Sequence, residues 1–239
     1  NVVAKETKEA AKIYGDARRT TIEEAKKASS EPVQVSEPVT VVVSQKGYVR
    51  CRTGHGHDAK LMSYKQGDAY QWSAECESTE TLIVCGSNGR TYSVPVSQLP
   101  SARGDGLPIT SFIELEAGSE IVGYLAGPDN LGVMLYTTEG FGLACSLKNL
   151  VARVRSGKAF MSVGEQAVMC PPVGLTEGSQ YVACMAQDGR LLVFTLEELR
   201  TLAGGGKGVT LMGGIDLFCG FSQACALRHI DSLEVQGAT

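Results

Sequence analysis

The chain has 239 residues, 43% of them hydrophobic and 20% charged, with a net charge of −4 at pH 7. This is the composition of a soluble globular protein that can bury a substantial core, and its apolar runs are shorter than the ~18 residues that a membrane-spanning helix needs, so we expect a cytoplasmic chain. The negative charge excludes a protein that binds nucleic acid with its whole surface, and any contact with DNA has to be local.

The first 30 residues differ in character from the rest. They carry seven Lys or Arg against five acids, out of totals of 22 and 26, so the remainder is the more acidic part. Alanines among Lys and Glu predict an exposed helix over residues 1–14, which Gly15 ends. A second short helix is expected from Thr20 or Thr21, where Glu23 or Glu24 completes a capping box.

A linker is expected next, because Ser, Glu and Pro dominate the stretch up to Pro38. We therefore divide the chain into a helical tail of the upstream region at 1–30, a linker at 31–37 and a second domain at 38–239.

Beyond residue 38 the sequence repeats one plan four times. Each copy has an apolar, β-branched run, a polar turn ending in Gly and a second apolar run, which predicts a β-hairpin. The four hairpins are expected at Val39–Cys51, Thr81–Val94, Asn130–Cys145 and Gln180–Phe194, with turn glycines Gly47, Gly89, Gly140 and Gly189.

A glycine-rich loop carrying basic residues follows each hairpin. The loop glycines Gly56, Gly106, Gly157 and Gly208 are 50, 51 and 51 residues apart. A period near fifty built of strands predicts an all-β, propeller-like domain of about five four-stranded blades. Residues after Lys207 are too few for a regular fifth blade, so the last one is expected to be divergent or partial, with a closing strand at 229–235. The alternative is a β-sandwich whose spacing is coincidental.

The glycine-rich loops are the candidate functional sites. Backbone N–H groups freed by glycine, together with Arg or Lys, contact phosphates without distinguishing the bases. The stretch from Lys148 to Lys158, with four bases and no acid, is the strongest candidate patch. The residues predicted to contact DNA are Lys46, Arg50, Arg52, Lys60, Arg90, Arg103, Lys148, Arg153, Arg155, Lys158, Arg190 and Lys207.

The sequence gives little support for a disulfide, a metal site or a catalytic site. The eight cysteines form no Cys-x-x-Cys pair and mostly stand among apolar residues, so we expect them to be reduced and packed in the core. His55 and His57 could share one side of a strand with Asp58 beside them, but a fourth metal ligand is not evident. No nucleophile has a base partner, so we predict neither a catalytic nor a metal site.

Several segments resemble the A subunits of bacterial type IIA topoisomerases, the topoisomerase IV and gyrase family. Residues 14–20 (YGDARRT) are similar to the end of the breakage-reunion region, and residues 37–50 (EPVTVVVSQKGYVR) to the first strand pair of the C-terminal domain. Further similarity lies at 99–104 (LPSARG), at 149–153 (NLVAR) and at 157–159 (GKA). The resemblance runs from about residue 8 to residue 212.

The resemblance implies a β-pinwheel, a propeller-like disc with exchanged strands, whose basic outer rim binds and bends duplex DNA. It implies an accessory domain without cofactors, in a heterotetramer whose catalytic core carries the active-site tyrosine and whose B subunits carry the ATPase site. The whole enzyme uses ATP and Mg²⁺ in the bacterial nucleoid, for decatenation, relaxation and the selection of DNA crossings.

Within the family we favour topoisomerase IV over gyrase. Gyrase A subunits carry a Gln-Arg-Arg-Gly-Gly-Lys-Gly box, and the nearest segment here, residues 203–208 (AGGGKG), lacks the leading basic pair. A gyrase wrapping domain and a propeller scaffold for protein partners remain the alternatives, and a propeller hydrolase has no acidic or histidine-rich cluster to support it.

Overall fold

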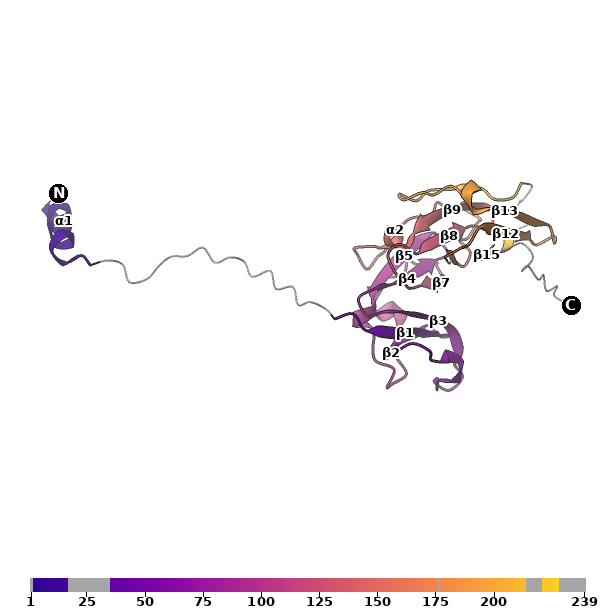
Figure 1. The fold of residues 1–239 in the computed structure, drawn as a ribbon, viewed down its shortest axis with the longest axis horizontal. Helices are drawn as coiled ribbons and strands as arrows, with labels where there is room; N and C mark the ends of the chain where they lie inside the picture. The colour runs from indigo at the N-terminus through magenta and orange to yellow at the C-terminus, as the bar shows by residue number, and fades with distance from the viewer. Residues whose placement is uncertain (1, 17–34, 176, 214–220, 228–239) are drawn as a thin grey trace. The chain divides into compact units, whose positions relative to one another are not determined.

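The computed structural model describes residues 2–16, 35–175, 177–213 and 221–227, with the side chains of 221–224 excepted. It divides into two compact units, Asn1–Gln34 and Val35–Thr239 (Figure 1). The first contains the helix α1 (Val2–Tyr14), whose side chains are all exposed. Gly15 donates its N–H to the carbonyl of Ala11 and ends this helix as predicted. The second expected helix lies outside the described residues.

The second unit consists of antiparallel sheets connected in series, and it confirms the propeller-like all-β prediction (Figure 1). Each predicted hairpin forms the centre of one sheet. The central pairs are β1 (Pro38–Ser44) with β2 (Tyr48–Thr53), β4 (Thr81–Gly86) with β5 (Arg90–Pro95), β8 (Gly132–Tyr136) with β9 (Phe141–Ser146), and β12 (Tyr181–Ala186) with β13 (Leu191–Thr195).

One edge of each sheet is formed by a strand that follows the hairpin in the chain. These edge strands are β3 (Tyr70–Glu77), β7 (Ile121–Leu125), β11 (Val173–Leu175) and β15 (Phe221–Leu227), in the first to the fourth sheet.

The opposite edge of the first three sheets is supplied by the next repeat. These two-residue strands are β6 (Leu107–Pro108) on β2, β10 (Lys158–Ala159) on β5, and β14 (Val209–Thr210) on β9. Each strand comes directly after one of the periodic loop glycines, so each glycine loop reaches back to the preceding sheet. We call the four equivalent stretches Gly56–Ala59, Gly106–Ile109, Gly157–Phe160 and Gly208–Leu211 the exchange segments.

The close approach of the exchange segments explains their glycines. Gly106, Gly157 and Gly208 have φ of +85°, +68° and +82°, a region that L side chains avoid. A Cβ at Gly106 would meet the carbonyl oxygen of Val49, and one at Gly157 would lie 2.6 Å from the carbonyl oxygen of Thr91. The fifty-residue period is thus a period of strand exchange.

Short helical turns lie between the hairpins and the exchange segments or follow them. They are η1 (Ala59–Leu61), η2 (Val96–Gln98), η3 (Ile109–Ser111), α2 (Leu147–Leu150) and η4 (Leu196–Glu198). Equivalent leucines after the hairpins, Leu99, Leu150 and Leu199, are buried.

The core consists of three clusters that each join two neighbouring sheets. Leu82 and Val84 of β4 pack with β1 and β2 of the first sheet, whereas Ile83 and Cys85 pack with β8 and β9 of the third. A third cluster joins the third and fourth sheets. Strands buried on both faces need apolar residues at every position, which is why the hairpin strands are continuous rather than alternating apolar runs.

Among the described residues, the expected divergent or partial fifth unit forms no sheet of its own. Of the residues after Lys207, β14 belongs to the third sheet and β15 pairs with β12 as the third strand of the fourth sheet. The described residues therefore form four sheets, three of them four-stranded. The closing strand expected at 229–235 lies outside the described residues.

Seven of the eight cysteines fall within the described part and are free thiols, five of them buried. Burial raises the pKa of Cys76, Cys85, Cys145 and Cys184 to about 12, so these thiols are neutral at physiological pH. They act as small apolar residues, as the sequence predicted. None of the described helices is long and apolar enough to cross a membrane.

Candidate nucleic-acid interface

The exchange of strands creates a basic cleft beside the first sheet. Here the segment leading to β6 runs along β2, with a parallel bridge between Cys51 and Ser101. The cleft has a volume of about 520 Å³, and we call it the first arginine cleft. Its lining residues are Arg50, Cys51, Arg52, Thr53, Met62, Ser63, Ser101, Ala102 and Arg103.

The three arginines of the first cleft have different environments. Arg52 and Arg103 are exposed. Arg50 is only 4% exposed, and its guanidinium donates to the carbonyls of Ser63 (2.7 Å) and Gly104 (3.1 Å) and lies 4.9 Å from the ring centre of Tyr64. Arg50 was predicted to contact DNA, but its side chain is buried and two of its N–H donors bond to backbone carbonyls.

A second cleft occupies the equivalent place beside the second sheet. The segment after α2 runs along β5, and the N–H of Ala152 donates to the hydroxyl of Ser93 (2.7 Å). This second arginine cleft has a volume of about 440 Å³. It is lined by Thr81, Ser93, Val94, Pro95, Gln98, Ser111, Phe112, Val151, Ala152, Arg153, Val154 and Arg155.

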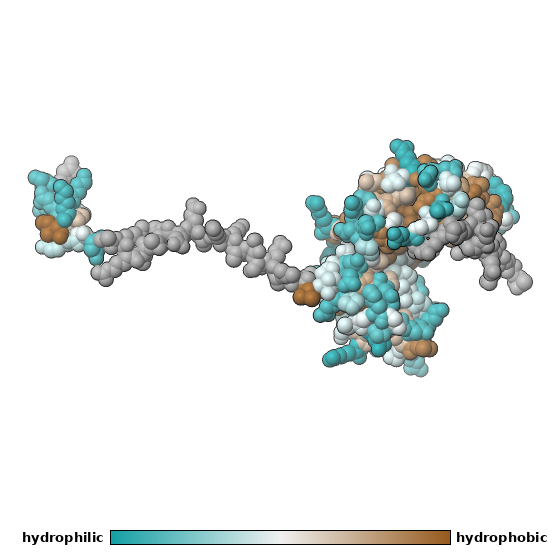
Figure 2. Space-filling model, in the orientation of Figure 1, coloured by the Kyte–Doolittle hydropathy of each residue, from teal (hydrophilic) through white to brown (hydrophobic). Residues whose placement is uncertain are grey.

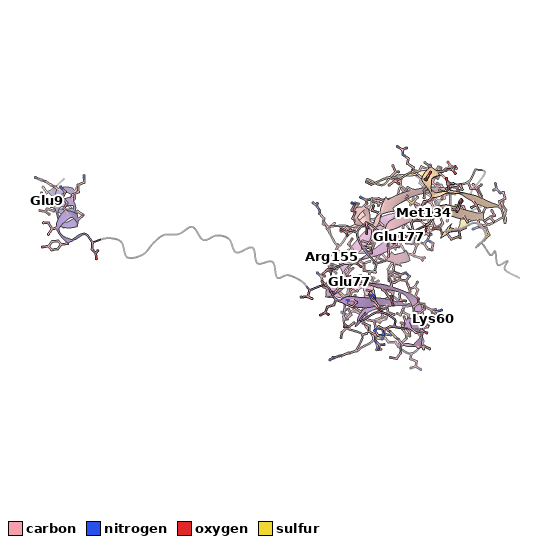
Figure 3. The ribbon with its side chains drawn as sticks, in the orientation of Figure 1. Glu9, Lys60, Glu77, Met134, Arg155 and Glu177 are labelled. Atoms are coloured by element: carbon pink, nitrogen blue, oxygen red, sulfur yellow. The ribbon has the colours of Figure 1, made fainter. Side chains whose placement is uncertain are left out.

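The predicted basic stretch from Lys148 to Lys158 separates into free and anchored side chains. Arg155 donates to the carbonyls of Phe112 (3.1 Å) and Ser111 (2.5 Å), and Lys158 donates to the carbonyl of Asn149 (2.6 Å). Arg153 is exposed at the cleft without such a contact within the described part of the chain. In Figure 3 the labelled Arg155 lies at the periphery of the domain, towards the first sheet.

Arg90 secures the exchange segment of the third repeat. Its guanidinium donates to the carbonyls of Ser156 (2.9 Å) and Gly157 (3.1 Å) and lies 3.6 Å from a carboxylate oxygen of Glu116. Arg90 therefore holds β10 on β5, and only the part of the side chain that stays accessible can meet a ligand.

The remaining predicted residues lie outside the two clefts. Lys46, Lys60 and Lys148 are exposed, and Figure 3 shows Lys60 on the other side of the first sheet from Arg155. Arg190 is paired with Asp188 (2.6 Å). Lys207 places its Nζ 3.9 Å from the ring centre of Phe141. The glycines before Lys207 let this loop pack against the backbone at Phe160, since a Cβ at Gly205 would meet the carbonyl oxygen of Phe160.

Both arginine clefts are electropositive because neither lining contains an Asp or a Glu. A third cleft, beside the fourth sheet, contains Glu197 and no cation. The chain is acidic overall, yet each of the two arginine clefts is lined by arginines without a carboxylate. Figure 2 shows hydrophilic side chains over much of the first sheet and more apolar colour over the upper part of the domain.

Sequence reasoning missed the neutral groups that complete the clefts. The residues Ser63, Ser93, Ser101 and Ser111 line them with polar atoms, and no periodic signal distinguishes these serines from others. It also missed Lys65, whose Nζ lies 3.8 Å from the ring centre of Tyr48. Burial raises the pKa of the Cys51 thiol, so Cys51 adds no negative charge to the first cleft.

The histidines near Gly56 make contacts within the first sheet. A ring nitrogen of His55 lies 3.0 Å from the carbonyl oxygen of Cys76, and one of His57 lies 2.9 Å from that of Thr53. Asp58 caps η1 by accepting the N–H of Lys60 (2.9 Å). Within the described ranges, no three His, Cys, Asp or Glu side chains are grouped so that they could hold a metal ion.

Comparison with known proteins finds relatives that are A subunits of DNA topoisomerase 4. The chain is 36% identical over 208 residues to the A subunit of DNA topoisomerase 4 from Escherichia coli K12, and 35% identical over 207 residues to the same protein from Pseudomonas aeruginosa. These matches cover 86% and 85% of this chain but only 28% and 27% of the relatives. The chain thus spans less than a third of the relatives' length. No family model matches the sequence.

Two solved C-terminal domains superimpose on this chain. The E. coli ParC C-terminal domain superimposes with a TM-score of 0.75 at 32% identity, covering 83% of this chain and 85% of that one. The DNA gyrase A C-terminal domain superimposes with a TM-score of 0.55 at 16% identity, covering 80% and 65%, and shares the fold.

Proposed function

Because the chain belongs to the family of C-terminal domains of topoisomerase IV A subunits, we propose that it binds and bends duplex DNA as the accessory domain of a type II topoisomerase. The observation that carries this proposal is the pair of equivalent arginine clefts without acidic residues. Positive charge at repeated positions beside successive sheets suits a polyanion whose charges also repeat.

The exposed arginines are the proposed phosphate ligands. Arg52 and Arg103 of the first cleft and Arg153 of the second are exposed, and arginine pairs with phosphate through two parallel hydrogen bonds. The anchored cations Arg50, Arg90, Arg155 and Lys158 are proposed to shape the clefts, and those with accessible donors add a weaker contact. We propose that these side chains contact phosphates rather than base edges, so we expect binding that is largely independent of sequence.

The proposal includes the rest of the enzyme. The breakage and rejoining of DNA, with ATP and Mg²⁺, would belong to the catalytic core of the A subunits together with the ATPase-bearing B subunits in a heterotetramer. The domain would hold a DNA segment at the nucleoid so that crossings and catenanes are selected, and would contribute neither a catalytic residue nor a cofactor.

The test is a bending assay on a short duplex labelled at both ends with a donor and an acceptor fluorophore. We expect energy transfer to rise on addition of the full chain, because contacts at two neighbouring clefts draw the ends together. The Arg52→Ala/Arg103→Ala/Arg153→Ala variant should bind more weakly and bend less. A Lys5→Ala/Lys8→Ala/Lys12→Ala variant loses the same charge from α1 and should behave as the native chain. Equal binding by both variants would refute the assignment, and no binding by the native chain at low salt would favour a scaffold for protein partners.

A further inference from the structure

Among the described residues, the loops that carry the exchange segments are tied to one another at three equivalent points. In each loop, the residue two positions before the exchange glycine is hydrogen-bonded, directly or through one side chain, to the stretch that follows the preceding exchange segment. These residues are Gly104, Arg155 and Gly206. We call the three contacts the loop joints. They link neighbouring repeats outside the core clusters.

The first and third loop joints do not depend on an exposed side chain. At the first, the carbonyl oxygens of Gly104 and Ser63 both accept from the buried guanidinium of Arg50 (3.1 and 2.7 Å). At the third, the backbone alone makes the joint, since Gly206 donates its N–H to the carbonyl of Phe160 (2.8 Å).

The second loop joint is made by the exposed side chain of Arg155. Its Nε donates to the carbonyl of Phe112 (3.1 Å) and its Nη2 to the carbonyl of Ser111 (2.5 Å). The backbone adds one bond, from the N–H of Glu114 to the carbonyl of Arg155 (2.9 Å). A planar guanidinium bonds two carbonyls along one edge, and a lysine ammonium cannot reproduce that geometry. This joint therefore depends on the shape of the arginine as well as on its charge.

The second loop joint holds together the two walls of the second arginine cleft. One wall, with Ser111 and Phe112, belongs to the second repeat, and the other, residues 151–155, belongs to the third. The first wall continues from the exchange segment Gly106–Ile109, which pairs with β2 beside the first arginine cleft. Arg155 thus ties the second cleft to the stretch that leads from the first, and Figure 3 shows it on the side of the first sheet.

We propose that Arg155 is a positioning residue, which fixes the second arginine cleft relative to the first and so sets the bend of a bound duplex. The inference rests on the proposed DNA binding and names the group that determines its geometry. Bending a stiff duplex over a short site costs free energy. Two clefts impose a bend only if they keep their relative positions against the elastic force of the DNA. The core clusters hold the sheets, whereas the wall at residues 151–155 is a loop that the joint holds.

The variant Arg155→Lys tests this proposal, because it keeps the positive charge and removes the paired bonds to the two carbonyls. A duplex labelled at both ends, titrated with the full chain, gives two readings: the binding constant and the energy transfer at saturation. We expect Arg155→Lys to keep the salt slope of the native chain, because the number of cations is unchanged. Its energy transfer at saturation should be lower, since the second cleft no longer holds its position.

Hydrogen exchange without DNA reports on the joint itself. The N–H of Glu114 is bonded to the carbonyl of Arg155, so we expect it to exchange faster in Arg155→Lys than in the native chain. Circular dichroism checks folding of this variant.

Two further variants serve as controls. Arg153→Ala, on the same loop, should bind DNA more weakly, with a salt slope shallower by about 1, and keep the native exchange rate at Glu114. Arg200→Lys makes the same substitution at an exposed arginine that lines neither cleft. It should match the native chain in every reading.

The proposal requires both changes in Arg155→Lys together. Native energy transfer at saturation in this variant overturns it, and so does a lower energy transfer with unchanged exchange at Glu114, since the bend would then not depend on the joint. If the native chain and Arg155→Lys bend DNA equally, only this inference fails and the proposed DNA binding stands. A native chain that binds no duplex at low salt refutes both.

Discussion

Arg50 and Arg52 lie two positions apart on β2 and end in opposite environments. The guanidinium of Arg50 is buried and bonded to two backbone carbonyls, whereas Arg52 is exposed in the same cleft. The sequence identified both as bases near a glycine loop, but it could not separate them. What buries Arg50 is the segment around Ser63 and Tyr64, which follows in the chain and folds over the strand.

Because the two environments differ, we expect alanine substitution to lower stability at Arg50 and to weaken DNA binding at Arg52. Arg50→Ala leaves the carbonyls of Ser63 and Gly104 without their donors, so we expect the free energy of unfolding to fall by about 1–3 kcal/mol. Arg52→Ala should change it by less than about 0.5 kcal/mol and should weaken DNA binding. Urea denaturation measures the first effect and fluorescence anisotropy the second. Equal stability of the two variants would contradict the structural role of Arg50.

The buried thiols predict how stability depends on pH. The ordinary pKa of a thiol is 9.0, and burial raises that of Cys85, Cys145 and Cys184 to about 12 in the folded protein. A raised pKa means that the folded state disfavours the thiolate. The stabilisation is complete below pH 9 and is lost as the pH rises from 9 towards 12.

Thermal unfolding followed by circular dichroism between about pH 7 and pH 11 checks this. We expect these thiols to leave the midpoint temperature of unfolding unchanged up to about pH 9 and to lower it at higher pH. Replacing Cys85 by Ala should reduce the alkaline decline. A decline that is identical in this variant would contradict the assignment.

At the scale of elements, the hairpins could be predicted from the sequence and the strand exchange could not. A hairpin is local: the apolar runs of β1 and β2 and the turn at Gly47 stand together in the sequence. The exchanged strands are only two residues long, and β10 pairs with β5 across more than sixty residues. The period of the loop glycines was correctly identified, but the sequence did not show that Gly106, Gly157 and Gly208 permit close contact with the backbone of the preceding sheet.

Two glycine substitutions distinguish the cost of a side chain at positive φ from the cost of a steric clash with the preceding sheet. Gly157→Ala and Gly56→Ala both place a side chain at positive φ, but only the first pushes a Cβ against the carbonyl oxygen of Thr91 and the ring of Tyr92. We expect Gly157→Ala to lower the free energy of unfolding by about 1–3 kcal/mol more than Gly56→Ala does. Chemical denaturation of the two variants measures this difference. Equal losses would mean that the loop glycines serve turn geometry alone.

At the scale of the whole molecule, net charge is a poor guide to where a polyanion binds. The chain carries −4, and this argued against binding DNA with the whole surface. The two arginine clefts contain no acid, while the cleft at the fourth sheet contains Glu197 and no base. Composition could not show this segregation, because it depends on which loops the exchange brings beside each sheet. A DNA segment is expected to follow the first and second sheets and to leave the fourth.

The salt dependence of duplex binding tests the central claim most directly. Fluorescence anisotropy titrations across a series of salt concentrations give the slope of the logarithm of the binding constant against the logarithm of salt. Each phosphate contact contributes about 0.9 to this slope. We predict a steep negative slope for the native chain and a slope shallower by up to about 3 for Arg52→Ala/Arg103→Ala/Arg153→Ala. A salt-independent affinity, or an unchanged slope in that variant, would contradict phosphate binding at the arginine clefts.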